Sequence, residues 1–318
     1  MIFNKKALEF SFSWIFAIIV GAVIIFLAVY ASTEFIKTEK TKQDTVLGKQ
    51  LGIILTPIET NLETGKITKI SIPEETRIYN ECKSSQGTFG TQKISLATKL
   101  LNDEWGKPGF PSTFNNKYIF SQDVIEGKEY FVFAKPFNMP FKIADLIYLW
   151  PSDENFCFVN PPREIEDEIL DLGISINITS SASECKKEAK KVCFTTSGCD
   201  IDISLDSSGN IKGSLKKKFA DRVYFETSAL LYAAIFSSPE VYECHLKRLM
   251  KRTSELSLLY YSKSLLLNSK GCASNLEVDL SSYTNKLFAF NSSLDLRELF
   301  FDAEIIRRKN EALSCKLF

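Results

Sequence analysis

The sequence predicts an α+β protein with an N-terminal transmembrane helix and stalk, a strand-rich extracytoplasmic domain and a C-terminal helical part. Three observations lead to this fold class. An apolar run occupies residues 10–31 of the 318-residue chain. Short alternating apolar segments fill the middle of the chain, and from Pro239 onward the apolar residues recur at helical spacing.

The segment 10–31 is long enough to cross a bilayer. As an α-helix, its roughly 22 residues extend about 33 Å, and the hydrocarbon core of a bilayer is about 30 Å thick. Trp14 and Tyr30 stand near its two ends, where aromatic rings are enriched at membrane interfaces. A cleaved secretory signal has a shorter apolar core and a small-residue site, so we expect a retained anchor.

The cysteines predict on which side of the membrane the chain lies. Basic residues flank the span at both ends, so charge leaves the orientation open. All eight cysteines follow the span, which favours an oxidising exterior. We therefore expect a single-pass protein of the cell membrane, with residues 1–9 as a cytoplasmic tail and the C-terminal domain extracytoplasmic. Sequons at Asn177 and Asn291 are compatible with glycosylation there.

Residues 32–56 are predicted to continue the helix as a stalk. They are rich in charge, and the helix is expected to stop near Pro57, since proline disfavours helix in the residue before it.

Residues 57–237 are predicted to form the strand-rich domain. Turn residues separate short runs of strand character, namely ITKISI, KYIF, EYFVFAKPF, DLIYLW and FCFV. The segment 199–219 predicts two strands around a turn that starts at Asp206. Acidic residues that follow Pro162 favour a helix start at that point.

Residues 238–318 are predicted to be a helical subdomain packed on the sheet. Apolar residues recur in steps of four and three from Tyr242 to Tyr260, and again from Leu296 to the C-terminus. A shorter helix is expected after Cys272. Both long series are compatible with a coiled coil that binds a partner, but each is short and has polar seam positions, which favours internal packing.

The eight cysteines are predicted to form disulfides. They stand at Cys82, Cys157, Cys185, Cys193, Cys199, Cys244, Cys272 and Cys315. Cys193 and Cys199 flank five residues, and a tight hairpin there brings the two sulfurs within bonding reach.

The other pairings follow from position along the chain. We expect Cys82 to pair with Cys157 inside the strand-rich part, and Cys244 to pair with Cys272 or Cys315 inside the helical part. A zinc site is the alternative, but the sequence has no C-x-x-C pair.

Catalytic motifs are not evident, and we expect neither an enzyme nor a cofactor or metal. His245 is the sole histidine, so a catalytic triad would have to be built around it. Ser214 and Lys217 match S-x-x-K but lack the companion elements of serine acyltransferases. The sequence contains no G-x-S-x-G turn, Walker loop or G-x-G-x-x-G. A glycosidase pair of carboxylates distant in sequence stays open.

The N-terminus resembles a known type of signal. Lys5, Lys6 and Ala7 followed directly by an apolar helix are similar to the class III signal of archaeal type IV pilin-like proteins. In those proteins a peptidase cuts after the basic residues, and the helix packs into a filament core. The resemblance implies processing between Ala7 and Leu8. It departs at Glu9, which would be the second mature residue, whereas bacterial-type pilins carry glutamate at the fifth.

Two further stretches carry a second resemblance. The segment ALLYAAIFSSPEVYECHLKRLMKR and the cysteine-bearing end SCKLF look like those of uncharacterised, membrane-anchored surface proteins of small-genome archaea. That group has no assigned activity to transfer.

Together these observations predict a membrane-anchored, disulfide-stabilised structural or interaction protein at the cell surface. The alternatives are a type IV pilin-like filament subunit or minor pilin, and a membrane-tethered hydrolase. The expected partners are the lipid bilayer, other surface proteins and copies of the chain itself. Lysines plus arginines number 39, as do aspartates plus glutamates, so net charge gives no sign of nucleic-acid binding.

Overall fold

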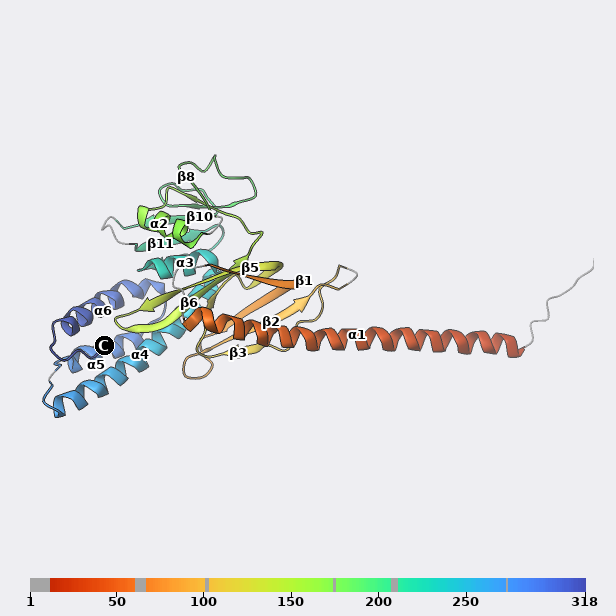
Figure 1. Cartoon of the computed structure of the whole chain (residues 1–318), viewed down its shortest axis with the longest axis horizontal. Coiled ribbons are helices and arrows are strands. Elements are labelled where there is room, and N and C mark those ends of the chain that lie inside the picture. The colour runs from red at the N-terminus through yellow and green to blue at the C-terminus, as the bar shows by residue number, and fades with distance from the viewer. Residues whose placement is uncertain (1–11, 61–66, 101–102, 174–175, 207–210, 273) are drawn as a thin grey trace, which may run out of the picture.

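The fold is mixed α+β, with a long apolar helix at the N-terminus, strands in the centre and helices at the C-terminus (Figure 1). The computed structural model describes residues 12–60, 67–100, 103–173, 176–206, 211–272 and 274–318. The expected cytoplasmic tail and the expected processing site at Ala7 and Leu8 lie outside these residues.

The helix α1 (Phe12–Thr60) is uninterrupted along its length. Its N-terminal half extends away from the rest of the molecule, and its C-terminal half lies along the first sheet (Figure 1). The expected end near Pro57 is one turn too early, because the helix continues to Thr60. The second half of the expected stalk is part of the folded body, because it packs against strands β2, β3, β5 and β6.

The first sheet has the strand order β3-β2-β1-β5-β6-β4, and its neighbours are antiparallel except for β4 and β6. Its strands are β1 (Thr68–Lys83), β2 (Thr91–Thr98), β3 (Ser112–Phe114), β4 (Tyr118–Phe120), β5 (Val124–Asn138) and β6 (Lys142–Pro151). The runs expected to be strands from ITKISI to DLIYLW coincide with these elements, except that Ile67 and Lys117 each lie one residue before the strand.

Both faces of the first sheet are buried. Along β6, Ile147 and Leu149 face α1, whereas Leu146, Tyr148 and Trp150 enter a larger core on the opposite face. This alternation follows from the two-residue period of a strand. The first sheet is therefore a central layer, with α1 on one side and the remaining elements on the other.

The second sheet has the strand order β12-β11-β10-β9-β7-β8. Its strands are β7 (Phe156–Val159), β8 (Asn177–Thr179), β9 (Lys190–Cys193), β10 (Ile201–Leu205), β11 (Gly213–Lys217) and β12 (Arg222–Phe225). The expected pair of strands after Cys199 is confirmed as β10 and β11, which are antiparallel. The helix α2 (Arg163–Leu172) begins after Pro162, as its acidic first turn predicts.

The C-terminal part is helical and packs on the larger core. It follows the buried helix α3 (Ser228–Phe236) and contains α4 (Pro239–Ser269), α5 (Glu277–Phe288), a short 3₁₀ turn (Ser293–Asp295) and α6 (Leu296–Glu311). The apolar series of α4 and α6 face this core, so the expectation of internal packing is confirmed for them.

The expectation that the last helix reaches the C-terminus is wrong, because α6 ends at Glu311. The final residues fold back so that Leu317 is buried. Asn310 accepts a hydrogen bond from the Leu317 N–H at 2.7 Å and donates one to the Phe318 carbonyl at 2.7 Å. The burial of Leu317 and these two bonds favour the turn over another helical turn.

The contact between α1 and the first sheet rests on a narrow stripe of α1. Leu51 and Leu55 are buried there, and Gly48 and Gly52 allow close approach. A Cβ atom at Gly52 would lie 2.6 Å from the Phe114 ring. Small residues at these positions let the helix lie directly against the sheet.

Leu55→Ala is expected to destabilise the protein by about 2–5 kcal/mol, since it leaves a cavity under α1. Ile53→Ala is the matched control on the same turn. Because Ile53 is 69 % exposed, its truncation should change stability by about 0.5 kcal/mol or less. Chemical denaturation of the two variants in detergent checks this, and equal midpoints would contradict the packing described for α1.

Candidate functional site

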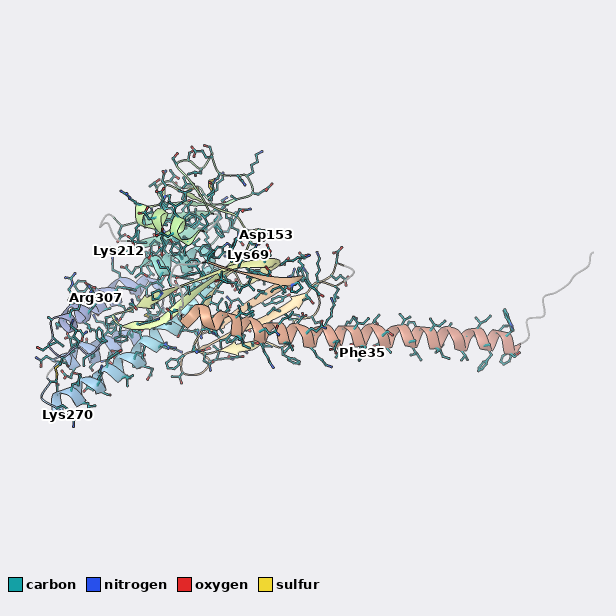
Figure 2. The ribbon with its side chains drawn as sticks, viewed as in Figure 1. Phe35, Lys69, Asp153, Lys212, Lys270 and Arg307 are labelled. Carbon is teal, nitrogen blue, oxygen red and sulfur yellow. A yellow bond between two sulfur atoms is a disulfide. The ribbon has the colours of Figure 1, made fainter. Side chains whose placement is uncertain are left out.

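The N-terminal half of α1 is a continuous exposed apolar surface. Side chains from Phe12 to Ile36 are exposed on all sides of the helix. By length and composition, α1 is able to cross a membrane. In the side-chain view this part of the helix stands free of the body, with Phe35 pointing into the surroundings (Figure 2). An apolar helix without an internal face is suited to lipid or to other apolar helices.

The junction between α1 and the sheet contains a buried acid. Asp44 is 1 % exposed, and its Oδ2 accepts a hydrogen bond from the Thr98 N–H at 3.3 Å. Its other oxygen has no hydrogen-bond partner and lies beside a hollow of about 390 Å³ between α1 and β1. Burial raises the pKa of Asp44, although the Thr98 hydrogen bonds and the Lys40 charge oppose the increase.

Four disulfides lie in the body of the molecule. The expected pair Cys193–Cys199 is present, and Asp202 accepts hydrogen bonds from the N–H groups of Gly198 and Cys199 in its turn. The remaining bonds are Cys82–Cys244, Cys157–Cys185 and Cys272–Cys315.

The other expected pairings are wrong. Cys82 does not pair with Cys157, because β1 lies in the first sheet against α4, whereas Cys157 lies on β7 in the second sheet. Cys244 therefore bonds to Cys82, and Cys272 and Cys315 bond to each other where the last residues fold back beside α4. The position of a cysteine along the chain does not predict its partner here, because α4 belongs to the helical part but packs against β1 of the first sheet.

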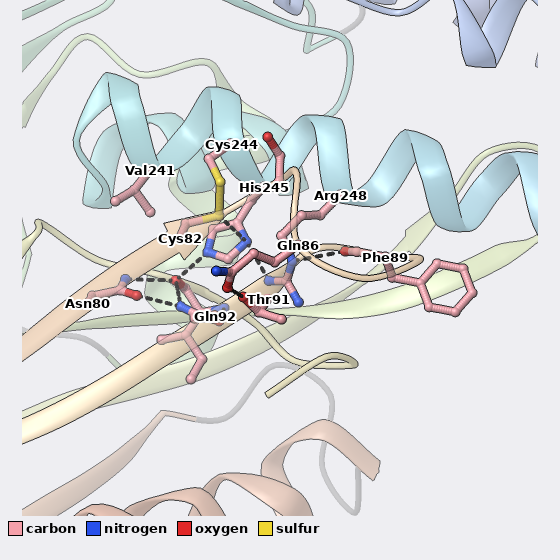
Figure 3. Close-up of a disulfide and its surroundings, with 12 residues drawn as sticks. Asn80, Cys82, Gln86, Phe89, Thr91, Gln92, Val241, Cys244, His245 and Arg248 are labelled. Carbon is pink, nitrogen blue, oxygen red and sulfur yellow. Dashed lines mark hydrogen bonds between the residues drawn. A yellow bond between two sulfur atoms is a disulfide. The ribbon is translucent and has the colours of Figure 1, made fainter. Parts of the chain in front are cut away.

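The Cys82–Cys244 disulfide lies beside a buried polar cluster (Figure 3). His245 is fully buried, with Nδ1 3.8 Å from Cys82 Sγ. Its Nε2–H donates to the Ile119 carbonyl at 3.1 Å, so Nδ1 accepts a hydrogen bond from Arg248 at 3.0 Å. Burial and the guanidinium hold the pKa of His245 well below its ordinary value, and the ring is neutral.

Arg248 is the centre of this cluster and is fully buried, which is rare for arginine. Its guanidinium lies 4.7 Å from the centre of the Tyr118 ring. It donates hydrogen bonds to four main-chain carbonyls, those of Phe89, Phe114, Asn115 and Lys117. Burial lowers the pKa of Arg248 to about 10, so the group stays charged at neutral pH. The arginine holds two loops against α4.

Two buried amides complete the cluster at the edge strand β4. Gln92 accepts a hydrogen bond from the Ile119 N–H at 3.0 Å and donates one to its carbonyl at 2.8 Å. Asn80 donates to the same carbonyl at 3.1 Å and to Ser121 at 2.9 Å. The backbone N–H and carbonyl of Ile119 lie on the outer side of β4, where no strand of the described chain pairs with them. The two amide side chains satisfy these groups and so stabilise this edge of the sheet.

A second polar group joins the first sheet to the helices α2 and α3. Lys135 on β5 forms an ion pair with Glu168 on α2 and donates a hydrogen bond to Ser228 at 2.9 Å. Tyr232 donates to the other Glu168 oxygen at 3.1 Å. Glu168 therefore connects α2 to β5 and α3.

The S-x-x-K pattern does not form a catalytic pair. Ser214 and Lys217 are three residues apart on β11, so their side chains point to opposite faces. The Lys217 ammonium donates hydrogen bonds to the carbonyls of Ile235 and Ser237. Burial lowers the pKa of Lys217 to about 7. Within the part of the chain that the structure describes, no three His, Cys, Asp or Glu side chains lie together as a metal site.

The sequons lie at the surface. Asn177 is on β8 and Asn291 precedes the 3₁₀ turn, and both residues are exposed. Their glycosylation stays a prediction.

Sequence reasoning did not identify Asp44 or Arg248. Arg248 stands one helical turn after His245, so their shared face was a usable signal. Asp44 lies in a stretch rich in charged and polar residues, and no sequence pattern distinguishes it from the exposed residues around it.

The chain was compared with protein-family models, with curated proteins and with solved structures, and no match was found in any of the three.

Asp44→Asn is expected to stabilise the protein at neutral pH. Because the folded-state pKa of Asp44 is raised, the folded state holds its proton to higher pH than the unfolded state. The protonated carboxyl of Asp44 therefore stabilises the folded state at low pH. This stabilisation is lost as the pH rises above about 3.9, the pKa of the unfolded state, and through the higher pKa of the folded state. Thermal midpoints of wild type and variant should therefore diverge with rising pH. Glu39→Gln, an exposed neighbour on α1, should show no such divergence.

Removal of Cys82–Cys244 is expected to cost more stability than removal of Cys193–Cys199. The first bond closes a loop of 162 residues and the second a loop of 6. In the chain-entropy model these loops correspond to about 5 and about 2 kcal/mol. Denaturant unfolding of the two double Cys→Ser variants measures the difference. An equal loss for both variants would contradict the assigned connectivity.

Proposed function

We propose that the chain is a single-pass membrane protein that holds a disulfide-stabilised interaction module outside the cytoplasm. The N-terminal half of α1 serves as the anchor in this proposal, and the α+β body is the presented module. The observation that carries the proposal is the continuity of α1, since one helix contains both the exposed apolar half and the half that is packed on the first sheet.

The orientation is supported by the cysteines. All four disulfides belong to the body, on the C-terminal side of the apolar half of α1. Disulfides persist in oxidising compartments, so the body belongs on the exterior side and the short N-terminus inside.

The packing of α1 gives the module a fixed position. A flexible linker would let the body reorient above the bilayer, whereas Leu51 and Leu55 join helix and sheet without a hinge. The body therefore moves with the anchor. Such an arrangement suits a structural or interaction protein that presents one surface in a set direction.

A second candidate function is a filament subunit. It is favoured by the exposure of α1 on all sides, because identical apolar helices cover such a surface as well as lipid does. The two candidates differ in the N-terminus of the native protein. A permanent anchor retains Met1 or Ile2 in membranes, whereas pilin-type processing leaves Leu8 first in a sheared extracellular fraction.

Ile19→Arg combined with Ile24→Arg is expected to remove the protein from carbonate-washed membranes. Each arginine at the centre of a spanning helix costs about 2.5–3.5 kcal/mol of insertion free energy. Ile53→Arg combined with Ile54→Arg is the control, because these side chains are also exposed on α1 but lie along the body. Fractionation followed by immunoblotting measures both variants. Full membrane retention of the first variant would contradict the assignment of the span.

A further inference from the structure

The outer half of α4 presents a row of leucines to solvent. Leu258, Leu259, Leu265 and Leu266 are 39 %, 62 %, 49 % and 59 % exposed. Ser262 lies between them and is also exposed. Positions three, four, seven and eight apart share one face of a helix, so these five residues form a single surface. We call it the outer leucine face.

The outer leucine face is separate from the core-facing side of α4. On the core side, Leu256, Tyr260 and Leu267 pack against the larger hydrophobic core, and Ser257 donates a hydrogen bond to the Leu280 carbonyl of α5. The two sides of the same helix segment are therefore both apolar. A surface helix with one buried side normally carries polar residues on the other, so the exposed leucines indicate an interaction surface.

The outer leucine face is symmetric about Ser262. The sequence LLYYSKSLL from Leu258 to Leu266 places leucines three and four residues before the serine and again three and four residues after it. When two such helices run antiparallel with the serines opposite each other, Leu258 of one copy faces Leu266 of the other, and Leu259 faces Leu265. A two-fold axis through Ser262 creates this arrangement, which is the self-complementary pattern of an isologous interface.

The flanking charges fit the same arrangement. Glu255 precedes the leucines on the exposed side of α4, and Lys270 follows them at the C-terminal end. Antiparallel pairing brings Glu255 of one copy to the end of the helix where Lys270 of the other copy lies. A parallel arrangement would instead place Glu255 beside Glu255, which is unfavourable.

We propose that the outer leucine face binds the same face of a second copy, with the two α4 helices antiparallel about an axis at Ser262. The small serine lets the helices approach closely, and four leucines from each copy are removed from water. In Figure 1 this segment lies at the opposite end of the molecule from the apolar half of α1.

Ser262→Cys in the full chain tests the pairing. The eight native cysteines are all in disulfides, so the new thiol is the one available for cross-linking. Under mild oxidation in detergent, the introduced thiols of two copies should form a covalent dimer. Leu170→Cys is the control, because Leu170 is 66 % exposed on α2, outside the outer leucine face. This control should stay monomeric.

Leu259→Asp combined with Leu266→Asp, added to Ser262→Cys, should reduce the cross-linked fraction at least tenfold with an unchanged thermal midpoint. Leu170→Asp in the same background should leave that fraction intact. A monomeric Ser262→Cys protein at high concentration would overturn the proposal. So would a dimer that survives both aspartates, which would place the contact elsewhere. If a fluorophore attached to Ser262→Cys in phosphatidylcholine vesicles is quenched by quenchers within the bilayer, and the two aspartates remove this quenching, the face binds lipid and the proposal fails.

Discussion

The structure depends on covering both faces of the first sheet. Strands β5 and β6 carry apolar side chains on both sides, and exposure of either side would leave a large apolar surface in water. The C-terminal helices and the second sheet cover one side. The other side is covered by α1, so the segment that extends from the body as an apolar helix is also part of the fold. The apolar helix and the body are consequently one structural unit.

Two buried ionisable side chains, Arg248 and Asp44, lie among the elements that pack on this sheet. Arg248 donates hydrogen bonds to four main-chain carbonyls, and it thereby holds two loops against α4. Asp44 is less well satisfied, with one carboxylate oxygen unpaired beside the α1 junction. A buried group of this kind costs stability, so the docking of α1 is weaker at neutral pH than an apolar residue would allow.

Much of the secondary structure could be predicted from the sequence, because strands and helices leave periodic patterns. The two-residue alternation located β5 and β6, and the helical spacing located α4. The cysteine pairing could be predicted only for Cys193 and Cys199, whose contact is local. The bond between Cys82 and Cys244 depends on the path of α4 across the sheet, and no local pattern contains that path.

The burial of the polar cluster could not be predicted, for a similar reason, although the shared helix face of His245 and Arg248 was visible in the sequence. His245 and Arg248 look like part of a charged helix surface in sequence, and their burial follows from loops that are distant along the chain. For the outer leucine face, the leucines themselves are evident in the sequence. Only the structure separates the leucines of α4 that face solvent from those that face the core.

A distance measurement shows directly whether α1 is joined to the body without a hinge. Spin labels at Ile36→Cys on α1 and Val278→Cys on α5 both occupy exposed helical positions. Pulsed electron paramagnetic resonance on the labelled full chain, diluted with an excess of unlabelled protein in lipid bilayers, should give a single narrow distance distribution. A broad distribution would show that the body reorients relative to the anchor and would contradict the account.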